Sequence, residues 1–334
     1  MPNPNPEPRI QNPEPMNIRI GTSGWSYPSG LGMWNGVFYP ARGQTGPRRP
    51  GGLSSTFDEL SYYAEHFDTV EVNSTFYQLP RAEITRRWVQ RTPQDFEFSL
   101  KLNRKFTHPE MFRQATGREH SRAEQADVDA FRAGLDPIAR AGKLGALLAQ
   151  FPPSFKSDSA SRDYLAWLLS TFSDHSVAVE LRHRSWSDDV QGTLTLLNEL
   201  GAAWVQIDEP KFRFSIRQNY LPNVTSFYYM RLHGRNATKW WRHDTVEERY
   251  DYLYSRDELK PFAETADAAH RLVKKLYLYL NNHFSAKAVA NAAILKHQLG
   301  MPVAGDYPPQ FLVCYPELEG IVSPSGRPLL QPSS

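Results

Sequence analysis

A single (β/α)8 barrel is the fold class that this sequence predicts, on three observations. The first is length, since 334 residues suit one large α/β domain. The second is a regular alternation of short apolar runs, rich in β-branched and aromatic residues, with longer stretches of helical pattern. The third is the number of these runs, because eight strand–helix units are the number that closes a barrel.

The apolar runs supply the expected strands, and helical patterns lie between them. The expected strands are residues 17–25, 69–77, 96–102, 145–151, 176–182, 203–208, 227–233 and 276–283. The expected helices are residues 56–66, 82–90, 121–140, 161–172, 189–200, 257–274 and 286–299. A doubly wound open sheet is the alternative, but it would need a glycine-rich phosphate fingerprint at an early strand end, and residues 21–24 are too short for one.

The two ends of the chain differ in composition from its centre. Residues 1–16 alternate proline with polar residues and contain no apolar segment typical of a secretory signal. We expect an extended, disordered tail there. The barrel domain is expected over residues 17–306, followed by a proline-rich C-terminal extension at residues 307–334.

Charge, hydropathy and cysteine content limit the class of protein. The formal net charge is only +2, so no global field draws the chain to nucleic acid or to membranes. No stretch approaches the roughly 20 apolar residues that span a bilayer. The single cysteine, Cys314, excludes an intramolecular disulfide and suits a reducing compartment. We therefore expect a cytoplasmic protein with no membrane partner.

Alternation of side chains along each strand predicts which of them face the barrel interior. Successive side chains point to opposite faces of a strand, and the apolar face should meet the helices. In the second strand Val70 and Val72 then face outward, which places Glu71 and Asn73 inside. The same argument gives further inward polar residues on the other strands: Ser23, Glu97, Ser99, Lys101, Gln150, Glu180, Arg182, Gln206, Asp208, Arg231, His233, Tyr279, Asn281 and His283.

These polar residues lie near the carboxyl ends of their strands, where barrel enzymes build their active sites. A purely structural network is the alternative, because Glu71 or Glu180 could simply neutralise Arg231. Burying many charges is costly before pairing offsets it, and an apolar barrel core would serve stability as well. We therefore favour a functional site.

Several motifs, in order along the chain, carry a family resemblance. They are GTSGWSY (21–27), FYP (38–40), VEVNSTFY (70–77), QFPP (150–153), ELRH (180–183) with SW (185–186), RLHGR (231–235) and NNH (281–283). With these motifs the sequence resembles the family called domain of unknown function 72, over residues 18–300 or so. The resemblance implies a barrel fold and no particular reaction, so function has to be argued from the site. Residues 41–52 look like an insertion after the FYP motif, and we interpret them as a tolerated surface loop, with the edge of a mobile lid as the alternative.

The predicted mouth of the barrel is basic although the chain is nearly neutral. Lys101, Arg182 and Arg231 point inward, and the loops after the strands add further cations: Arg104, Lys105, His108, His183, Arg184, Arg235, Lys239 and Arg242. Arginine binds phosphate or carboxylate through paired hydrogen bonds. We predict that a small anionic molecule binds near Arg182, Arg231 and His233. The residues expected to bind the substrate are Asn73, Lys101, Arg182, Trp186, Arg231, Asn281 and His283.

Carboxylates and histidines in the inward set could transfer protons. The expected catalytic residues are Glu71, Glu180, Asp208 and His233, because a histidine beside a carboxylate is a usual arrangement for general acid–base catalysis. The same residue types bind divalent metals, but the neighbouring cations would compete and no compact metal motif is present. We predict no cofactor and no specific metal ligands, with a divalent metal left as the alternative. The sequence has no serine nucleophile motif and no cysteine near the predicted site, so we do not expect a serine hydrolase or a thiol hydrolase.

Two function classes follow. The first is an enzyme, a hydrolase or isomerase, that acts on a phosphorylated or other anionic polar substrate at the mouth of the barrel. The second, ranked lower, is a nucleic-acid-binding protein by fold analogy with endonuclease IV-like barrels. The basic loops and the aromatic residues Trp25 and Trp186 favour the second class, since aromatic rings stack on bases, and the near-neutral net charge opposes it.

Overall fold

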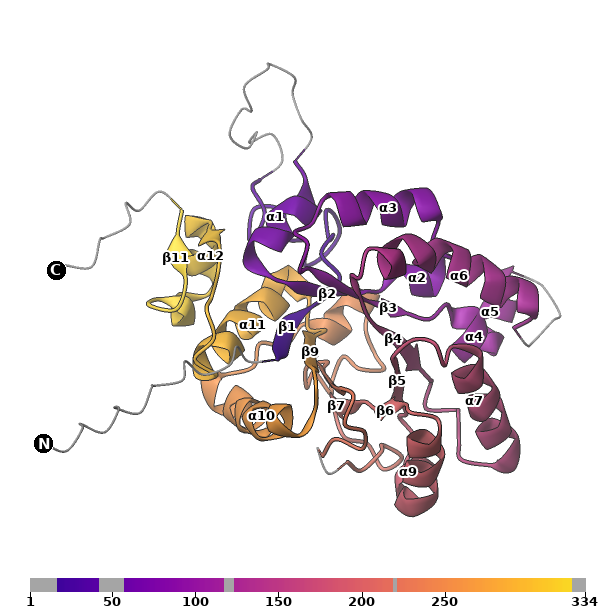
Figure 1. Ribbon diagram of the computed structural model, residues 1–334. Coiled ribbons are helices and arrows are strands. Elements are labelled where there is room, and N and C mark those ends of the chain that lie inside the picture. The colour runs from indigo at the N-terminus through magenta and orange to yellow at the C-terminus, as the bar shows by residue number, and fades with distance from the viewer. Residues whose placement is uncertain (1–16, 42–56, 117–122, 219–220, 326–334) are drawn as a thin grey trace, which may run out of the picture.

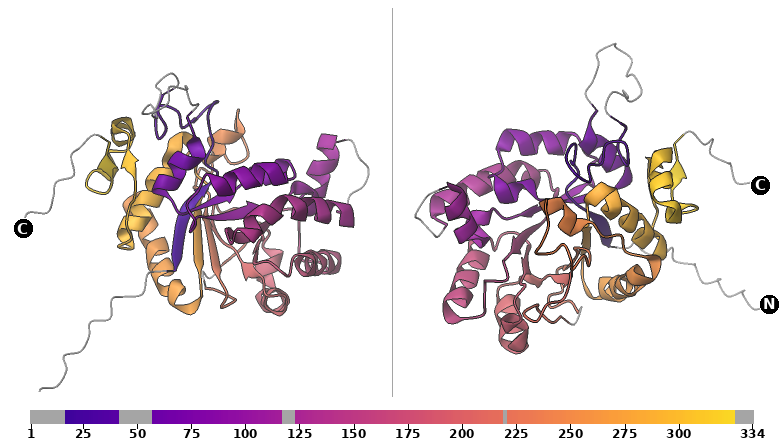
Figure 2. Two further views of the ribbon diagram at one scale, coloured as in Figure 1. Left: turned by 45° about the horizontal axis from the view of Figure 1, so that its top comes forward. Right: turned by 180° about the vertical axis from the view of Figure 1, so that it is seen from behind.

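The computed structural model describes residues 17–41, 57–116, 123–218 and 221–325. Its centre is a parallel sheet that nearly closes into a barrel, with helices around the outside (Figures 1 and 2). The strands are β1 (Ile18–Ser23), β2 (Thr69–Val72), β3 (Glu97–Lys101), β4 (Leu144–Gln150), β5 (Val177–Glu180), β6 (Ala203–Trp204), β7 (Gln206–Asp208), β8 (Tyr228–Leu232) and β9 (Leu276–Leu280). The predicted barrel is confirmed.

Long helices follow the strands and cover the outer face of the sheet. They are α1 (Glu59–His66), α3 (Ala82–Gln90), α6 (Gln125–Arg140), α7 (Ser159–Thr171), α9 (Val190–Glu199), α10 (Arg256–Ala269) and α11 (Lys287–Gln298). Shorter helices lie in the loops after the strands: α2 (Ser74–Tyr77), α4 (Arg104–Thr107), α5 (Pro109–Thr116) and α8 (Ser185–Asp188). Side-chain caps such as that of Asp58, which accepts from the Ser61 N–H at 3.0 Å, fix where these helices begin.

Several predicted strands run past the observed ends, and two differ most from the observed strands. The run 69–77 is too long, because residues after Val72 turn into α2, which places Phe76 beside Lys101 at the end of β3. The run 203–208 forms two pieces. β6 pairs with β5, β7 pairs with β8, and these two pairings bring the ends of the sheet together. At the break, side chains replace strand partners: the Ile207 N–H donates to the Gln218 side chain at 2.8 Å.

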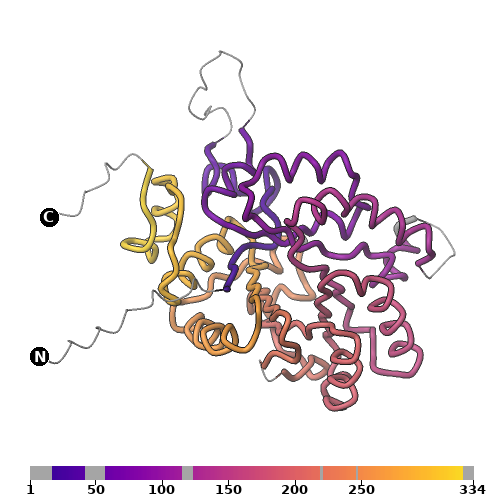
Figure 3. Tube along the Cα trace, in the orientation of Figure 1, coloured from indigo at the N-terminus to yellow at the C-terminus, as the bar shows by residue number. Residues whose placement is uncertain are grey.

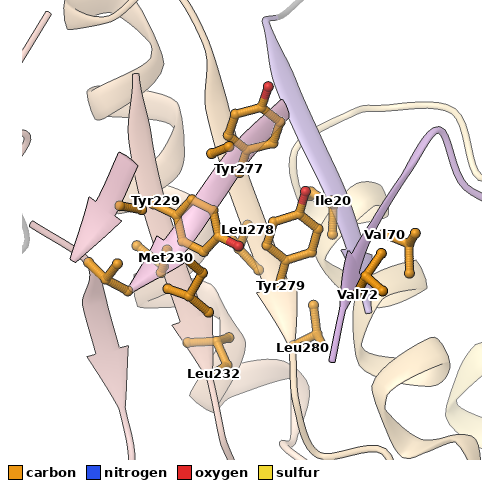
Figure 4. Close-up of a cluster of buried hydrophobic side chains, with 14 of the residues drawn as sticks. Ile20, Val70, Val72, Tyr229, Met230, Leu232, Tyr277, Leu278, Tyr279 and Leu280 are labelled. Carbon is orange, nitrogen blue, oxygen red and sulfur yellow. The ribbon is translucent and has the colours of Figure 1, made fainter. Parts of the chain in front are cut away.

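The interior of the barrel is filled in layers by the predicted alternation on most strands. The prediction is wrong for β7, where Ile207 pairs with Arg231 and faces inward, while Gln206 and Asp208 pair with Met230 and Leu232 and face outward. The lower layer, toward the amino ends of the strands, contains Glu97 and Tyr277, whose hydroxyl donates to the Glu97 carboxylate at 2.6 Å. Tyr229 and Tyr279 lie next to Tyr277 on the side of the carboxyl ends (Figure 4), with their ring centroids 5.2 Å apart. Glu71 and Arg231 lie beyond these rings, toward the carboxyl ends of the strands. The tyrosines therefore separate the polar cluster around Glu97 from the polar cluster around Arg231.

A C-terminal extension follows the barrel. It contains β10 (Asp306–Tyr307), α12 (Pro309–Cys314) and β11 (Ser323–Pro324), and β10 and β11 pair in parallel. Figure 3 traces this segment in yellow along the side of the barrel. Tyr307 and Phe311 pack on Phe38, with ring centroids 6.0 and 5.7 Å away. The predicted tail at 1–16, and the insertion predicted at 41–52 except for its first residue, lie outside the described residues.

Candidate functional site at the carboxyl ends of the strands

Arg231 of β8 is the centre of a buried charge network. Its guanidinium donates to both oxygens of Glu71 at 2.9 and 2.7 Å, and to the Gln150 side chain at 3.0 Å. A further ion pair joins it to Glu180. The Tyr229 hydroxyl and the Ser23 hydroxyl donate to Glu71 at 2.8 and 2.7 Å. The sequence predicted that these strands bring their polar residues together, and the structure places them so.

Glu180 connects this centre to a second arginine and to a histidine. Arg182 donates to the Glu180 carboxylate at 2.7 Å and lies 3.4 Å from Glu209. His233 is fully buried, with its Nε2 atom 3.4 Å from Glu180 and its Nδ1 atom 2.9 Å from the Asn281 amide. Every charged group of this network is therefore in contact with a group of opposite charge.

The pKa shifts of the network fix its protonation state. Burial alone would raise the pKa of Glu180, but the charges of Arg231 and Arg182 outweigh burial and hold that pKa well below its usual range. Burial, together with the positive charge of Arg231, lowers the pKa of His233 to about 3. Near neutral pH Glu180 is therefore ionised and His233 is neutral, and neither titrates there.

Lys101, at the end of β3, differs from the other charged residues near the network. Its amine has no hydrogen bond or ion pair with any described residue, and it lies 4.2 Å from the centroid of the Phe76 ring. Burial and the nearby positive charge of Arg231 lower the pKa of Lys101 to about 7. An amine with such a pKa exchanges protons readily near neutrality.

A cavity of about 190 Å³ opens above the network. Its wall combines residues of the strand ends with aromatic and acidic residues of the loops: Tyr27, Asn73, Tyr77, Lys101, Gln150, Arg231, Glu247, Tyr250, Asn281 and His283. Most of these groups are neutral and polar. The buried side-chain oxygen of Asn73 has no hydrogen-bond donor among the described residues, so it is available to a ligand.

The loop after β9 holds one side of this cavity in an unusual backbone conformation. Ser285 and Ala286 have φ angles of 51° and 63°, a left-handed region that non-glycine residues rarely adopt. The indole of Trp34 donates to the His283 carbonyl at 2.7 Å, and the His283 ring stacks on Tyr27 at 4.4 Å. Burial lowers the pKa of His283 to about 4. Backbone strain of this kind is often found at functional sites.

Two residues that the sequence placed in the site lie elsewhere. Asp208 accepts from Arg235 at 2.8 and 3.0 Å and from the Tyr254 hydroxyl at 2.7 Å, a separate cluster away from the cavity wall. Trp186 is fully buried, and its indole donates to the Phe155 carbonyl at 2.9 Å. Trp186 was predicted from the SW motif in a loop, but helix α8 turns its ring into the core.

The basic mouth is smaller than the sequence suggests, because most loop cations have acidic partners. Lys105 pairs with Asp127, Arg184 with Asp188, Arg235 with Asp208 and Lys239 with Glu248. Arg104 and Arg249 have no hydrogen bond or ion pair from their side chains within the described residues, and the Nε atom of each is buried without an acceptor. Both are close enough to Tyr77, at the cavity mouth, to oppose the rise of its pKa that burial causes.

The sequence missed Glu247 and Tyr250, two loop residues that line the cavity, and Arg249, which lies close to Tyr77 at its mouth. Loops have no side-chain alternation, so no periodic pattern marks their inward residues. Over the described residues, no group of three or more His, Cys, Asp or Glu side chains is arranged to hold a metal ion. Nor does any helix there have the length and apolar character needed to cross a membrane.

Comparison with known proteins agrees with this architecture. The sequence matches the family described as protein of unknown function DUF72 over residues 19–310. The chain belongs to this family. The DUF72 assignment confirms the resemblance carried by the motifs, and those motifs include Glu71, Glu180, Arg231 and Asn281 of the site.

Relatives and solved structures cover most of the chain. The UPF0759 protein YunF of Bacillus subtilis is 28% identical over 269 residues, which are 75% of this chain and 90% of that protein. A DUF72 family crystal structure from Thermotoga maritima is 32% identical with a TM-score of 0.68, covering 85% of this chain and 99% of the other. A DUF72 structure from Enterococcus faecalis has a TM-score of 0.70 at 23% identity, over 87% of this chain and 99% of that one, and supports the fold alone.

Proposed function

We propose that this DUF72 protein is an enzyme that acts on a small, polar, anionic molecule bound in the cavity above Arg231. The observation that carries the proposal is the contrast between paired and unpaired cations. Arg231 and Arg182 are neutralised by buried carboxylates, whereas Lys101 at the cavity wall lacks any such partner among the described residues. Arg104 and Arg249, near the mouth, are likewise without acidic partners within the described ranges.

Because of this contrast, we propose that the anion binds beside Lys101 and not near Arg182, Arg231 and His233, where the sequence predicted it. The donors of Arg231 are engaged by Glu71, Glu180 and Gln150, so an anion there would have to displace a buried carboxylate. Lys101 needs no such exchange. We propose that Lys101 contacts the bound molecule at the cavity wall and, together with Arg104 and Arg249 near the mouth, attracts its anionic group.

The reaction class that fits is proton transfer, as in an isomerase or a hydrolase. Lys101, with its pKa near 7, is better suited to accept or donate a proton than Glu180 or His233, whose pKa values lie far from neutrality. We propose that Glu71 and Glu180 act by holding Arg231, and that Asn73, Asn281 and His283 orient the substrate. A divalent metal remains an alternative, and the lone, exposed Cys314 suits the cytoplasmic location that we propose.

Thermal unfolding with inorganic phosphate tests the binding proposal. At constant ionic strength, phosphate should raise the melting temperature of the wild-type protein above its value in chloride. The Lys101→Met variant should lose most of this increase. Lys105→Met is the matched control, since it removes a neighbouring cation that already pairs with Asp127 at 2.6 Å, and it should keep the increase. Equal melting temperatures in phosphate and chloride for the wild type would contradict the proposal.

The pH dependence of phosphate binding gives a second test. A bound anion favours protonated Lys101, whose pKa in the free protein is about 7. Above that pH, binding requires proton uptake, so affinity for the dianion should fall by up to about tenfold per pH unit. Calorimetry at pH 7.5 and 8.5 in two buffers measures both the affinity and the proton uptake. An unchanged affinity would argue against Lys101 as the contact.

A second candidate function rests on a different surface. Phe212 and Phe214 stack at 5.6 Å, and exposed Trp241 lies 5.7 Å from Phe212. Phe212 also lines a cavity of about 510 Å³, together with Arg184, Lys211, Arg213 and Arg217. Aromatic rings among cations are typical of sites that bind single-stranded nucleic acid, so this surface supports the nucleic-acid alternative.

Fluorescence anisotropy with a labelled oligothymidine tests this alternative. Binding should weaken steeply with salt, and Trp241→Ala with Arg213→Ala should abolish it, while Lys101→Met should leave it unchanged. Absence of binding at low salt would remove the nucleic-acid candidate and leave the small-molecule proposal untouched.

A further inference from the structure

We propose that the amine of Lys101 is a nucleophile that forms an imine with an aldehyde or ketone carbon of the bound molecule. The inference rests on the proposed function, since it concerns the same cavity. It narrows the substrate class to a carbonyl compound that carries a phosphate or carboxylate group.

The position of the amine is the first support. Lys101 is the last residue of β3, and its neighbour in β4 is Leu148. A strand end in the middle of the sheet is a rigid base for a reacting group. The Nζ atom lies over the Phe76 ring at 4.2 Å, and with no acceptor among the described residues its lone pair, once deprotonated, is free to attack a ligand.

The protonation state of the amine is the second support. An ordinary lysine with pKa 10.5 has roughly 0.03% neutral amine at pH 7. Burial and the positive charge of Arg231 bring the pKa of Lys101 to about 7, so about half of the molecules carry the neutral, nucleophilic form at that pH. Glu71 and Glu180 do not reverse this shift, because each of them already pairs with Arg231.

The groups around the amine are the third support. The Asn73 side-chain oxygen lines the same cavity and is buried without a donor. An addition intermediate carries a new hydroxyl group on the former carbonyl carbon, and this hydroxyl can donate to Asn73. The amides of Gln150 and Asn281 also face the cavity, and neutral amides bind hydroxyl groups without raising the pKa of Lys101.

The chemistry balances without any further reactant. The lone pair of Nζ forms a bond to the carbonyl carbon, the carbon–oxygen π bond breaks, and one amine proton moves to the oxygen. The remaining carbon–oxygen bond then breaks, a second amine proton leaves with the hydroxyl as water, and a carbon–nitrogen double bond forms. Protonation of this imine makes it an electron sink that eases removal of a neighbouring proton, which is the step an isomerase needs.

Reductive trapping in the full-length protein tests the inference. The protein is incubated with dihydroxyacetone phosphate and sodium cyanoborohydride, which delivers hydride to the imine carbon and makes the adduct permanent. Peptide mapping by mass spectrometry should find the adduct on Lys101 at least tenfold faster than on any other lysine. Inorganic phosphate should slow this labelling, and the labelling rate should rise about tenfold from pH 6 to pH 8, as the neutral fraction does.

The controls separate this inference from the proposed function. Lys105→Met should label as the wild type does, and Lys101→Arg should show no adduct on the corresponding peptide. A thermal shift with phosphate but no preferential labelling of Lys101 would overturn the imine and leave the proposed function standing. If phosphate gives no thermal shift and Lys101 is not preferentially labelled, both the imine and the proposed function are overturned. Labelling of Lys101 that phosphate does not slow would support the imine and overturn the anionic substrate. If Lys101→Arg does not fold, the peptide map of the wild-type protein still shows whether Lys101 is labelled in preference to the other lysines.

Discussion

The two ends of the barrel interior both contain buried charges, but among the residues that the structure describes only the carboxyl end has a charge without an oppositely charged partner. Toward the amino ends of the strands, Glu97 contacts Lys275 at 2.6 Å, the Tyr277 hydroxyl at 2.6 Å and Arg19 at 3.4 Å. Toward the carboxyl ends, Arg231 and its carboxylates are equally well paired, yet Lys101 beside them has no acidic partner among the described residues. The comparison teaches that a buried ion network alone does not distinguish the two ends, and that the proposed function rests on the unpaired amine beside the cavity.

Loss of Arg231 should have the largest effect on stability. Arg231→Met would leave Glu71 and Glu180 buried without their main counter-ion, at a cost of about 3–5 kcal/mol. The double variant Arg231→Met/Glu180→Gln should be less destabilised than Arg231→Met alone, because it removes one of the unpaired charges. Urea unfolding of the two variants measures this. A double variant at least as unstable as the single one would contradict the role of Arg231 as counter-ion of Glu180.

A core substitution near the mouth should separate stability from binding. Trp186 is fully buried against Phe155, at 5.4 Å between ring centroids. Trp186→Phe should lower the free energy of unfolding by about 1–3 kcal/mol, mainly through the cavity that it leaves. The phosphate-dependent increase in melting temperature should persist. Its disappearance in a folded variant would return Trp186 to the binding site, where the sequence first placed it.

The strand alternation predicted the centre of the site well. Glu71, Glu180, Arg231 and Asn281 were assigned to the interior from the apolar residues between them, and the structure brings them together. Alternation reports only the direction of a side chain, however. It could not show that Arg231 is fully engaged by carboxylates, because partner choice depends on distances between strands far apart in the sequence.

The sequence misplaced Asp208 and missed Arg249 for two different physical reasons. Asp208 pairs in register with Leu232 and therefore lies on the outward face of the sheet, where Arg235 and Tyr254 from the loops after β8 hold its carboxylate in another cluster. Arg249, by contrast, comes from a loop without any pattern and lies close to Tyr77 at the cavity mouth. The assumption that the apolar face of a strand meets the helices fails in β7, where Ile207 faces the barrel interior. Loop geometry places Arg249, and no periodic pattern encodes it.

The pH dependence of stability should reveal the unpaired amine. The folded-state pKa of Lys101, about 7, lies below its unfolded value, so between these two values the unfolded chain binds more protons. Its contribution to stability is therefore unfavourable below pH 7 and improves as the pH rises, by up to about 1.4 kcal/mol per pH unit. Lys101→Met lacks this contribution. In urea unfolding, the free energy of unfolding of Lys101→Met should exceed that of the wild type by an amount that decreases from pH 7 to pH 9. A constant difference in this free energy would show that the pKa of Lys101 is not lowered.

Lys275→Met, at the opposite end of the barrel, should have the smallest effect. The Lys275 side chain is 39% exposed, so its ion pair with Glu97 is screened by water and is expected to contribute about 0.2–1 kcal/mol. Glu97 would keep Arg19 and the Tyr277 hydroxyl as partners. Urea unfolding should therefore show a small loss with little change between pH 7 and pH 9, and phosphate should stabilise the variant as it does the wild type. Since Lys275→Met and Lys101→Met remove the same charge from the same barrel, loss of the phosphate effect in both would mean that phosphate responds to net charge, whereas loss in Lys101→Met alone assigns the effect to the carboxyl end of the strands.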